Sequence, residues 1–141
     1  AKRAFLIEHG ADDVIVSPEL DFAAQARALT GGTGVDVVFN IVGQMAWAAA
    51  LKGMALGARH VFVGNLNAAP VSLRPAHAIL KEMSFLGTDG VTLAEVETLL
   101  ELVRLGRLRS VVGGSLPLAE AARAHQMMES REACGRLVLT M

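Results

Sequence analysis

The stretch GGTGVDVVFNIVG, residues 31–43, joins four glycines to a strongly apolar run, and it decides how the rest of the chain is interpreted. A glycine loop that grips phosphates follows a strand and opens a helix, so that its backbone N–H groups face the phosphates. Here Gly31, Gly32 and Gly34 precede the apolar run and follow a helix-like segment. This order predicts that a helix ends at these glycines and that a strand follows. Val42 and Gly43, at the other end of that strand, are therefore the residues of this stretch to consider for function.

The composition favours one globular domain or part of a larger one. Of the 141 residues, 52% are hydrophobic and 19% charged, which is ample for a packed core. The formal net charge of -1 predicts no nucleic-acid partner and no anionic membrane surface. No apolar run approaches the roughly 20 residues of a membrane helix and no signal peptide is visible, so we expect a cytoplasmic setting. The single Cys134 excludes an internal disulfide framework and a zinc-finger site.

Helix-like and strand-like segments alternate along the chain, which is typical of an α/β fold with a doubly wound parallel sheet. Capping supports two of the helices, because Asp21 can cap the second and Thr92 with Glu95 has capping-box spacing. Helices are expected at residues 2–9, 21–30, 45–56, 76–83, 93–106 and 117–129. Strands are expected at residues 13–16, 35–42, 60–63, 84–88 and 136–140.

Five segments, taken in order, resemble the medium-chain dehydrogenase/reductase superfamily, the group of zinc-type alcohol dehydrogenases and quinone oxidoreductases. The resemblance covers essentially the whole chain, and its specificity lies in the order and spacing of the segments together. The segments are GAD (10–12), LTGGTGVDVVFNIVG (29–43), LGARHVFVG (56–64), PLAEAARAHQMM (117–128) and GRLVL (135–139).

The resemblance implies a Rossmann-like sheet that is incomplete, because in family members the first two strands and the glycine-rich turn precede the segments matched here. The strands at 13–16, 35–42, 60–63 and 84–88 would then be the third to the sixth. In the strand order 3-2-1-4-5-6, two absent strands leave a gap of roughly 14 Å. The implied domains are 1–89, the C-terminal part of a dinucleotide-binding domain, and 90–141, a helix–strand segment returning towards an absent catalytic domain.

Cofactor-binding candidates follow from sheet order, because ligands of open α/β sheets bind beyond the carboxyl ends of the strands, where the strand order reverses. The resemblance agrees and places NAD or NADP there. The candidates at these strand ends are Val42, Gly43, Val63, Gly64, Asn65, Gly87 and Thr88. Each glycine could instead only open a tight turn.

Two basic residues are further candidates by resemblance. Lys2 matches a lysine near the adenosine ribose, and Arg136 matches a basic residue that reaches the pyrophosphate. A guanidinium can bind phosphate oxygens bidentately, which supports Arg136. Both side chains could instead be solvated surface charges.

The leading hypothesis is that this chain is part of an NAD(P)-dependent alcohol dehydrogenase or reductase. It would supply part of the cofactor crevice for hydride transfer to or from a small alcohol, aldehyde or enone. We expect weak or no cofactor binding by this chain alone, and a homodimer through the edge of the sixth strand. No catalytic residue or metal ligand is assigned, since the four histidines share no metal-ligand spacing and zinc ligands would lie outside this chain. The alternative is a non-catalytic doubly wound α/β domain for assembly or binding, because a fold alone does not imply activity.

Overall fold

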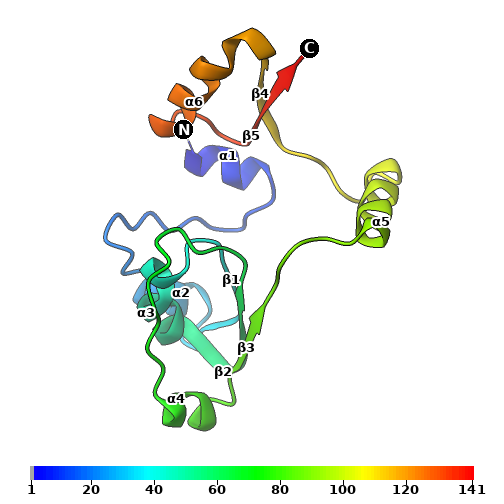
Figure 1. Ribbon diagram of the computed structural model, residues 1–141. Helices are drawn as coiled ribbons and strands as arrows, with labels where there is room; N and C mark the ends of the chain where they lie inside the picture. Colours follow the sequence, from blue (N-terminus) through cyan, green and yellow to red (C-terminus); the bar gives the residue numbers. More distant parts are fainter. Residues whose placement is uncertain (1) are drawn as a thin grey trace. The chain divides into compact units, whose positions relative to one another are not determined.

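The computed structural model describes residues 2–141, which fall into two units. One unit comprises Ile15–Gly90, and the other combines the N-terminal residues through Val14 with Val91–Met141. Parallel strands form a sheet in each unit, as expected for the C-terminal part of a Rossmann-like fold (Figure 1). No helix in the described part of the chain has the length and apolar character to cross a membrane.

The first unit contains a three-stranded parallel sheet in the order β1-β2-β3. Helices α2 and α3 lie together on one side of this sheet (Figure 1). The strands are β1 (Val35–Asn40), β2 (Met54–Phe62) and β3 (Ser84–Gly87), and the helices are α2 (Ala23–Leu29), α3 (Gln44–Gly53) and α4 (Pro75–Leu80). The predicted neighbours 35–42, 60–63 and 84–88 are therefore adjacent, as the sequence indicates.

The glycines at 31–34 form the predicted turn between α2 and β1. Gly32 N–H donates to the carbonyl oxygen of Arg27 at 2.7 Å, and the φ angles of Gly31, Gly32 and Gly34 are 63°, 88° and 96°. These are left-handed values that glycine adopts without steric cost. The prediction that Asp21 caps the helix is wrong, because α2 starts at Ala23 and no side chain caps it.

The core of this unit lies between α3 and the sheet. Trp47 and Leu51 of α3 pack with Met54, Ala55 and Ala58 of β2, and all five are buried. The helix expected at residues 45–56 is thus confirmed, but it ends at Gly53 and not at residue 56. Residues 54–56 join β2 because Met54 pairs with Val35, and this strand pairing overrides the helix propensity of Met, Ala and Leu.

Residues 13–16 do not form the predicted strand. A strand needs a neighbour that satisfies its backbone N–H and C=O groups, and none of the described strands lies alongside this segment. The residues of this segment, DDVIV (12–16), are not buried either, and Val16 is 68% exposed. The edge of β1 that would face the first strand of a complete sheet likewise has no partner among the described residues.

The second unit contains a two-stranded parallel sheet and three α-helices. Its elements are α1 (Lys2–Glu8), α5 (Leu93–Arg104), β4 (Val112–Pro117), the 3-10 helix η1 (Leu118–Glu120), α6 (Ala121–Glu129) and β5 (Arg136–Thr140). The capping box of α5 is confirmed, because Thr92 N–H donates to Glu95 Oε2 at 2.7 Å and Glu95 N–H donates back to Thr92 Oγ1 at 3.3 Å. The sequence did not predict β4, and the helix expected from residue 117 starts at Ala121, after the 3-10 turn.

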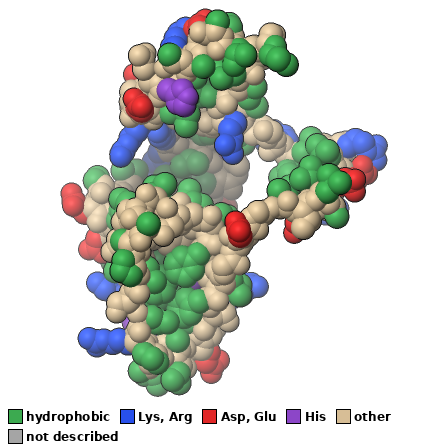
Figure 2. Space-filling model, viewed as in Figure 1, with side chains coloured by type: hydrophobic (Ala, Val, Ile, Leu, Met, Phe, Trp, Pro, Cys, Tyr) green, Lys and Arg blue, Asp and Glu red, His purple; other side chains and the backbone are tan. Residues whose placement is uncertain are grey.

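Hydrophobic side chains remain exposed along α5 (Figure 2). Leu93 is 76% exposed and Leu100 63%, although both belong to the apolar residues that recur along this helix. An amphipathic helix normally buries such a stripe against another element. Among the described residues of its own unit, nothing covers this face of α5.

Candidate functional site

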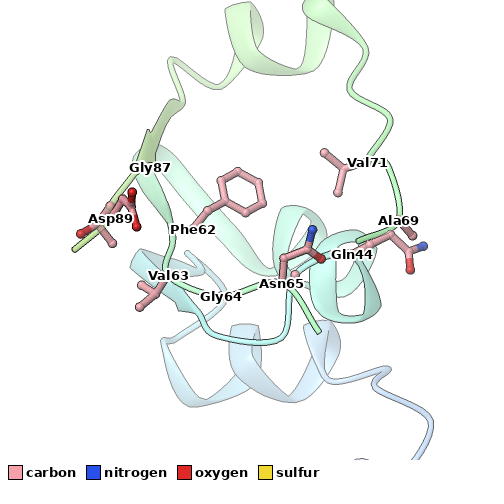
Figure 3. Close-up of a pocket in the computed structure, with 11 residues that line it drawn as sticks. Gln44, Phe62, Val63, Gly64, Asn65, Ala69, Val71, Gly87 and Asp89 are labelled. Atoms are coloured by element: carbon pink, nitrogen blue, oxygen red, sulfur yellow. The ribbon is translucent and has the colours of Figure 1, made fainter. Parts of the chain in front are cut away.

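A cavity of about 480 Å³ lies at the carboxyl ends of the three parallel strands (Figure 3). Its size is typical of small-molecule sites. In the close-up, the ring of Phe62 and the side chain of Val71 face the same space, with Asn65 beside them. The wall is built from the turns after β1, β2 and β3 and from the loop that follows β2.

Six of the nine predicted cofactor-binding residues line this one cavity. They are Gly43, Val63, Gly64, Asn65, Gly87 and Thr88. Val42 lies in the same turn as Gly43, but its side chain is not part of the wall. Whether these residues contact a cofactor stays a prediction.

Lys2 and Arg136 belong to the other unit. Lys2 is the first residue of α1, and Arg136 is the first residue of β5. Arg136 lines a different cavity, of about 440 Å³, within its own unit, together with Ser110, Val111 and Met128. The predicted roles of the two basic residues at the ribose and the pyrophosphate stay predictions.

The turns after β1 and β2 are packed against each other through two glycines. Gly43 has a φ of 74°, and a Cβ atom there would collide with Asn65. A Cβ atom at Gly64 would lie 2.5 Å from the carbonyl oxygen of Ile41. Both glycines are therefore required for this close approach of the turns, and both also line the cavity, whereas their contact with a cofactor stays a prediction.

The side chain of Asn40, the last residue of β1, holds the first of these turns. Asn40 is 3% exposed, and its Oδ1 accepts hydrogen bonds from the N–H groups of Val42 at 3.0 Å and Gly43 at 2.9 Å. Its Nδ2 donates to the carbonyl oxygen of Gly43 at 2.9 Å. The sequence analysis did not single out Asn40. A polar residue in a buried strand requires hydrogen-bond partners, and that signal could have identified it.

His60 lies beside Asn40 in the core. It is fully buried, and its ring contacts Trp47 and Phe62 at centroid distances of 5.0 and 4.4 Å. Asn40 Nδ2 is a donor 3.4 Å from His60 Nε2, so Nε2 must accept and the neutral ring carries its proton on Nδ1. Desolvation by burial lowers the pKa of His60 below its ordinary value of 6.5, which keeps the ring neutral at pH 7.

The loop after β2 is tied to α3 by two side chains. Trp47 Nε1–H donates to the carbonyl oxygen of Ser72 at 2.8 Å, and Asn67 Nδ2–H donates to Gln44 Oε1 at 3.2 Å. Gln44 lines the cavity and was not predicted, because its position depends on where α3 begins. These contacts fix the part of the wall that faces Phe62.

Asp89 supplies the one charged side chain among the described residues that line the cavity. It follows β3 directly, next to the predicted Gly87 and Thr88. No motif in the sequence pointed to it. Its carboxylate can accept hydrogen bonds from hydroxyl or amide groups of a ligand.

The described residues do not fit a metal centre. Within residues 2–141, no group of three or more His, Cys, Asp and Glu side chains is placed to hold a metal ion. A structural or catalytic zinc ion needs at least three such protein ligands. No chemistry of this chain is therefore derived through zinc.

A parallel α/β sheet with a ligand-sized cavity at its carboxyl edge defines the class of doubly wound nucleotide-binding folds. Within that class, the chain belongs to the zinc-binding dehydrogenase family, whose model matches residues 9–139. It is the C-terminal Rossmann portion of a medium-chain dehydrogenase/reductase. The recognition made from the five sequence segments is thereby confirmed.

Similar proteins and solved structures are consistent with this family. The chain is 29% identical over 140 residues to acryloyl-coenzyme A reductase of Metallosphaera sedula, covering 99% of this chain and 40% of that protein. Among solved structures, AibC is similar with a TM-score of 0.81 and 47% identity, over 95% of this chain and 38% of AibC. A mycobacterial protein, Rv1454c in complex with NADPH, gives a TM-score of 0.73 and 28% identity, over 99% of this chain and 47% of that protein. The chain thus spans about 40% of the curated relative.

Proposed function

We propose that this chain forms part of the cofactor site of an NAD(P)-dependent oxidoreductase. The observation that carries the proposal is the cavity at the carboxyl ends of β1, β2 and β3, where doubly wound folds bind nucleotides. Two glycine turns bring backbone to its wall, and Gly87 leaves a further part of the wall without a side chain. The NADPH found in one similar structure supports the same cofactor class for this chain.

In this proposal the residues of the chain bind and orient, and they supply no acid, base or nucleophile. The nicotinamide cofactor, when bound, provides the hydride. Phe62, Val63 and Val71 give the cavity an apolar side that excludes water, whereas Asn65 and Thr88 offer hydrogen-bonding groups. We propose a small alcohol, aldehyde or enone as the substrate. The name of the acryloyl-coenzyme A reductase relative favours the activated alkene within that set.

We further propose that the chain supplies only part of the site. Two apolar side chains of β1 are exposed, Val37 by 47% and Phe39 by 66%, and Ile41 in the turn that follows is 60% exposed. An uncovered apolar sheet face of this kind marks a contact surface. A further layer and a strand beside β1, from outside the residues described here, would cover it.

A homodimer through the edge of β3 also stays a proposal, as does the cytoplasmic setting. β3 ends the sheet order, so its outer edge has no strand neighbour in the part of the chain that the structure describes. Unpaired strand edges pair readily with a second chain. Light scattering of the full-length protein is the measurement, and a monomer at high concentration would contradict the dimer.

Filling the cavity tests the proposed function directly. In the full-length protein, Gly87→Leu adds a side chain to the wall, and a Cβ atom at Gly87 meets nothing within 4 Å, so the fold tolerates the change. We expect the affinities for NADH and NADPH, measured by fluorescence titration, to fall at least about tenfold, the equivalent of about 1.4 kcal/mol.

Ser84→Leu is the matched control, because Ser84 is exposed at the opposite end of the same strand. It should leave both affinities unchanged. Wild-type protein that binds neither cofactor would overturn the proposal and favour the non-catalytic assembly domain. Cofactor oxidation with small aldehydes, enones and enoyl thioesters then ranks the substrates.

A further inference from the structure

We infer that Asn40 is a positioning residue, whose side-chain amide holds the turn 41–43 in the conformation that places Gly43 in the wall of the cavity. The inference rests on the proposed function, because that function gives the cavity its ligand. It deepens the proposal by assigning a role to a residue that does not itself line the cavity.

The hydrogen bonds of Asn40 to the turn need both ends of its amide. Oδ1 accepts from the N–H groups of Val42 and Gly43, and Nδ2 donates to the carbonyl oxygen of Gly43. Gly43 therefore has both its N–H and its C=O bound to one side chain. A carboxylate at this position could accept but not donate, and an aliphatic side chain could do neither.

The backbone of Asn40 also holds the second turn. Its carbonyl oxygen accepts from the N–H groups of Val63 at 2.9 Å and Gly64 at 3.3 Å. The two turns that meet at the cavity are thus both attached to one residue. A shift of Asn40 would move Gly43 against Asn65, where there is no room for a Cβ atom and little for a displaced backbone.

His60 fixes the position of the amide from the other side. Its Nε2 lies 3.4 Å from Asn40 Nδ2, and its ring is wedged between Trp47 and Phe62 in the core. The Asn40 side chain is 3% exposed and the His60 side chain is fully buried, so water cannot replace either partner. The amide is therefore preorganised before any ligand arrives, which is the condition for a precise binding wall.

The test uses the full-length protein with two variants of Asn40. Asn40→Leu is close in size but removes every side-chain hydrogen bond, whereas Asn40→Asp keeps the acceptors and loses the donor. We expect the dissociation constants of NADH and NADPH to rise at least about tenfold in Asn40→Leu and about threefold in Asn40→Asp. Asp36→Asn, at an exposed position of the same strand, is the control and should change neither.

Amide hydrogen exchange supplies a readout that needs no cofactor. In Asn40→Leu the amides of Val42 and Gly43 should exchange faster, while amides in the middle of β2 keep their protection. A merely structural role would instead lower protection throughout the unit and leave the cofactor affinity of the folded protein unchanged.

Each outcome decides the inference. Wild-type affinity and wild-type exchange at Val42 and Gly43 in a folded Asn40→Leu protein would overturn it. If Asn40→Leu does not fold, Asn40→Asp carries the test, and unchanged affinity and exchange there would overturn it equally. If the wild type binds neither cofactor, the proposed function fails by itself, and the exchange data still decide whether Asn40 holds the turn.

Discussion

Trp47 and Ser72, 25 residues apart in the sequence, are joined by a 2.8 Å hydrogen bond from the indole Nε1–H to the backbone carbonyl oxygen. The indole ring also stacks on Phe62, with a centroid distance of 5.4 Å. One side chain therefore connects the core of the sheet to the loop that forms part of the cavity wall. This connection is the reason why loop and strand ends keep a common geometry.

Trp47→Phe separates the two roles of this side chain. The smaller ring keeps most of the stacking but loses the hydrogen bond, so we expect the free energy of unfolding to fall by about 1–3 kcal/mol. Trp47→Ala should cost more, about 3–5 kcal/mol, because it also leaves a cavity. Denaturant unfolding followed by circular dichroism measures both losses. Tryptophan fluorescence cannot serve here, because Trp47 is the single tryptophan and both variants lack it. Equal losses in the two variants would contradict the separation.

Gly64→Ala should destabilise the fold, whereas Gly87→Ala should not. A methyl group at Gly64 would press on the carbonyl oxygen of Ile41, which is backbone and cannot turn aside, but one at Gly87 meets open space. We expect a loss of about 1–3 kcal/mol for Gly64→Ala, as for overpacked positions, and little change for Gly87→Ala. Thermal unfolding compares the two, and similar midpoints would show that the turns can move apart.

His60 should make stability depend on pH. Because burial lowers its pKa in the folded state, the unfolded state binds the proton more readily. The contribution of the neutral ring is therefore fully present above about pH 6.5, the ordinary pKa of histidine, and is lost as the pH falls through the lower folded-state pKa. Protonation would also place a donor at Nε2 opposite the donor Nδ2 of Asn40.

His60→Phe tests this dependence. The phenyl ring fits among Trp47, Phe62 and Phe85 and removes a buried Nδ1–H that has no partner among the described residues. We expect the variant to lose most of the decline in unfolding free energy below pH 6.5. His125→Gln, at an exposed site on α6, is the control and should keep the wild-type profile. An unchanged profile in His60→Phe would assign the decline to other groups.

Thr92→Ala should loosen the start of α5. The change removes the acceptor for Glu95 N–H and one of the two donors to the Glu95 carboxylate. Loss of an N-cap of this kind costs about 1 kcal/mol of helix stability. Faster amide exchange in the first turn of α5, with unchanged exchange in α6, is the expected result. If the amides in the first turn of α5 exchanged at the same rate in the wild type and in the variant, that result would contradict a stabilising cap.

Local sequence signals predicted the elements whose causes are local. The glycines at 31–34 stop α2 because only glycine adopts the left-handed backbone without cost, and the Thr92–Glu95 spacing sets the start of α5. The apolar run at 35–40 became strand β1, since β-branched and aromatic residues favour extended backbone. The turn glycines Gly43 and Gly64 were likewise located from their place after two strands.

Errors arose wherever a partner distant in the sequence decided the outcome. Residues 13–16 have the composition of a strand but find no neighbour, whereas residues 54–56 have the composition of a helix but belong to β2, where Met54 pairs with Val35. Asn40 could be recognised as polar in an apolar run, yet its neighbour His60 lies 20 residues further along the chain.

The sequence by itself determined the family, through a resemblance carried by five ordered segments, and it indicated the strand ends at which the cavity lies, because apolar runs and the glycines after them mark those ends. The tertiary structure decided which polar groups serve the site. Burial makes an unpaired polar group costly, so Asn40 must bond the turn beside it and His60 must stay neutral. Such requirements exist only once the chain has folded around those groups.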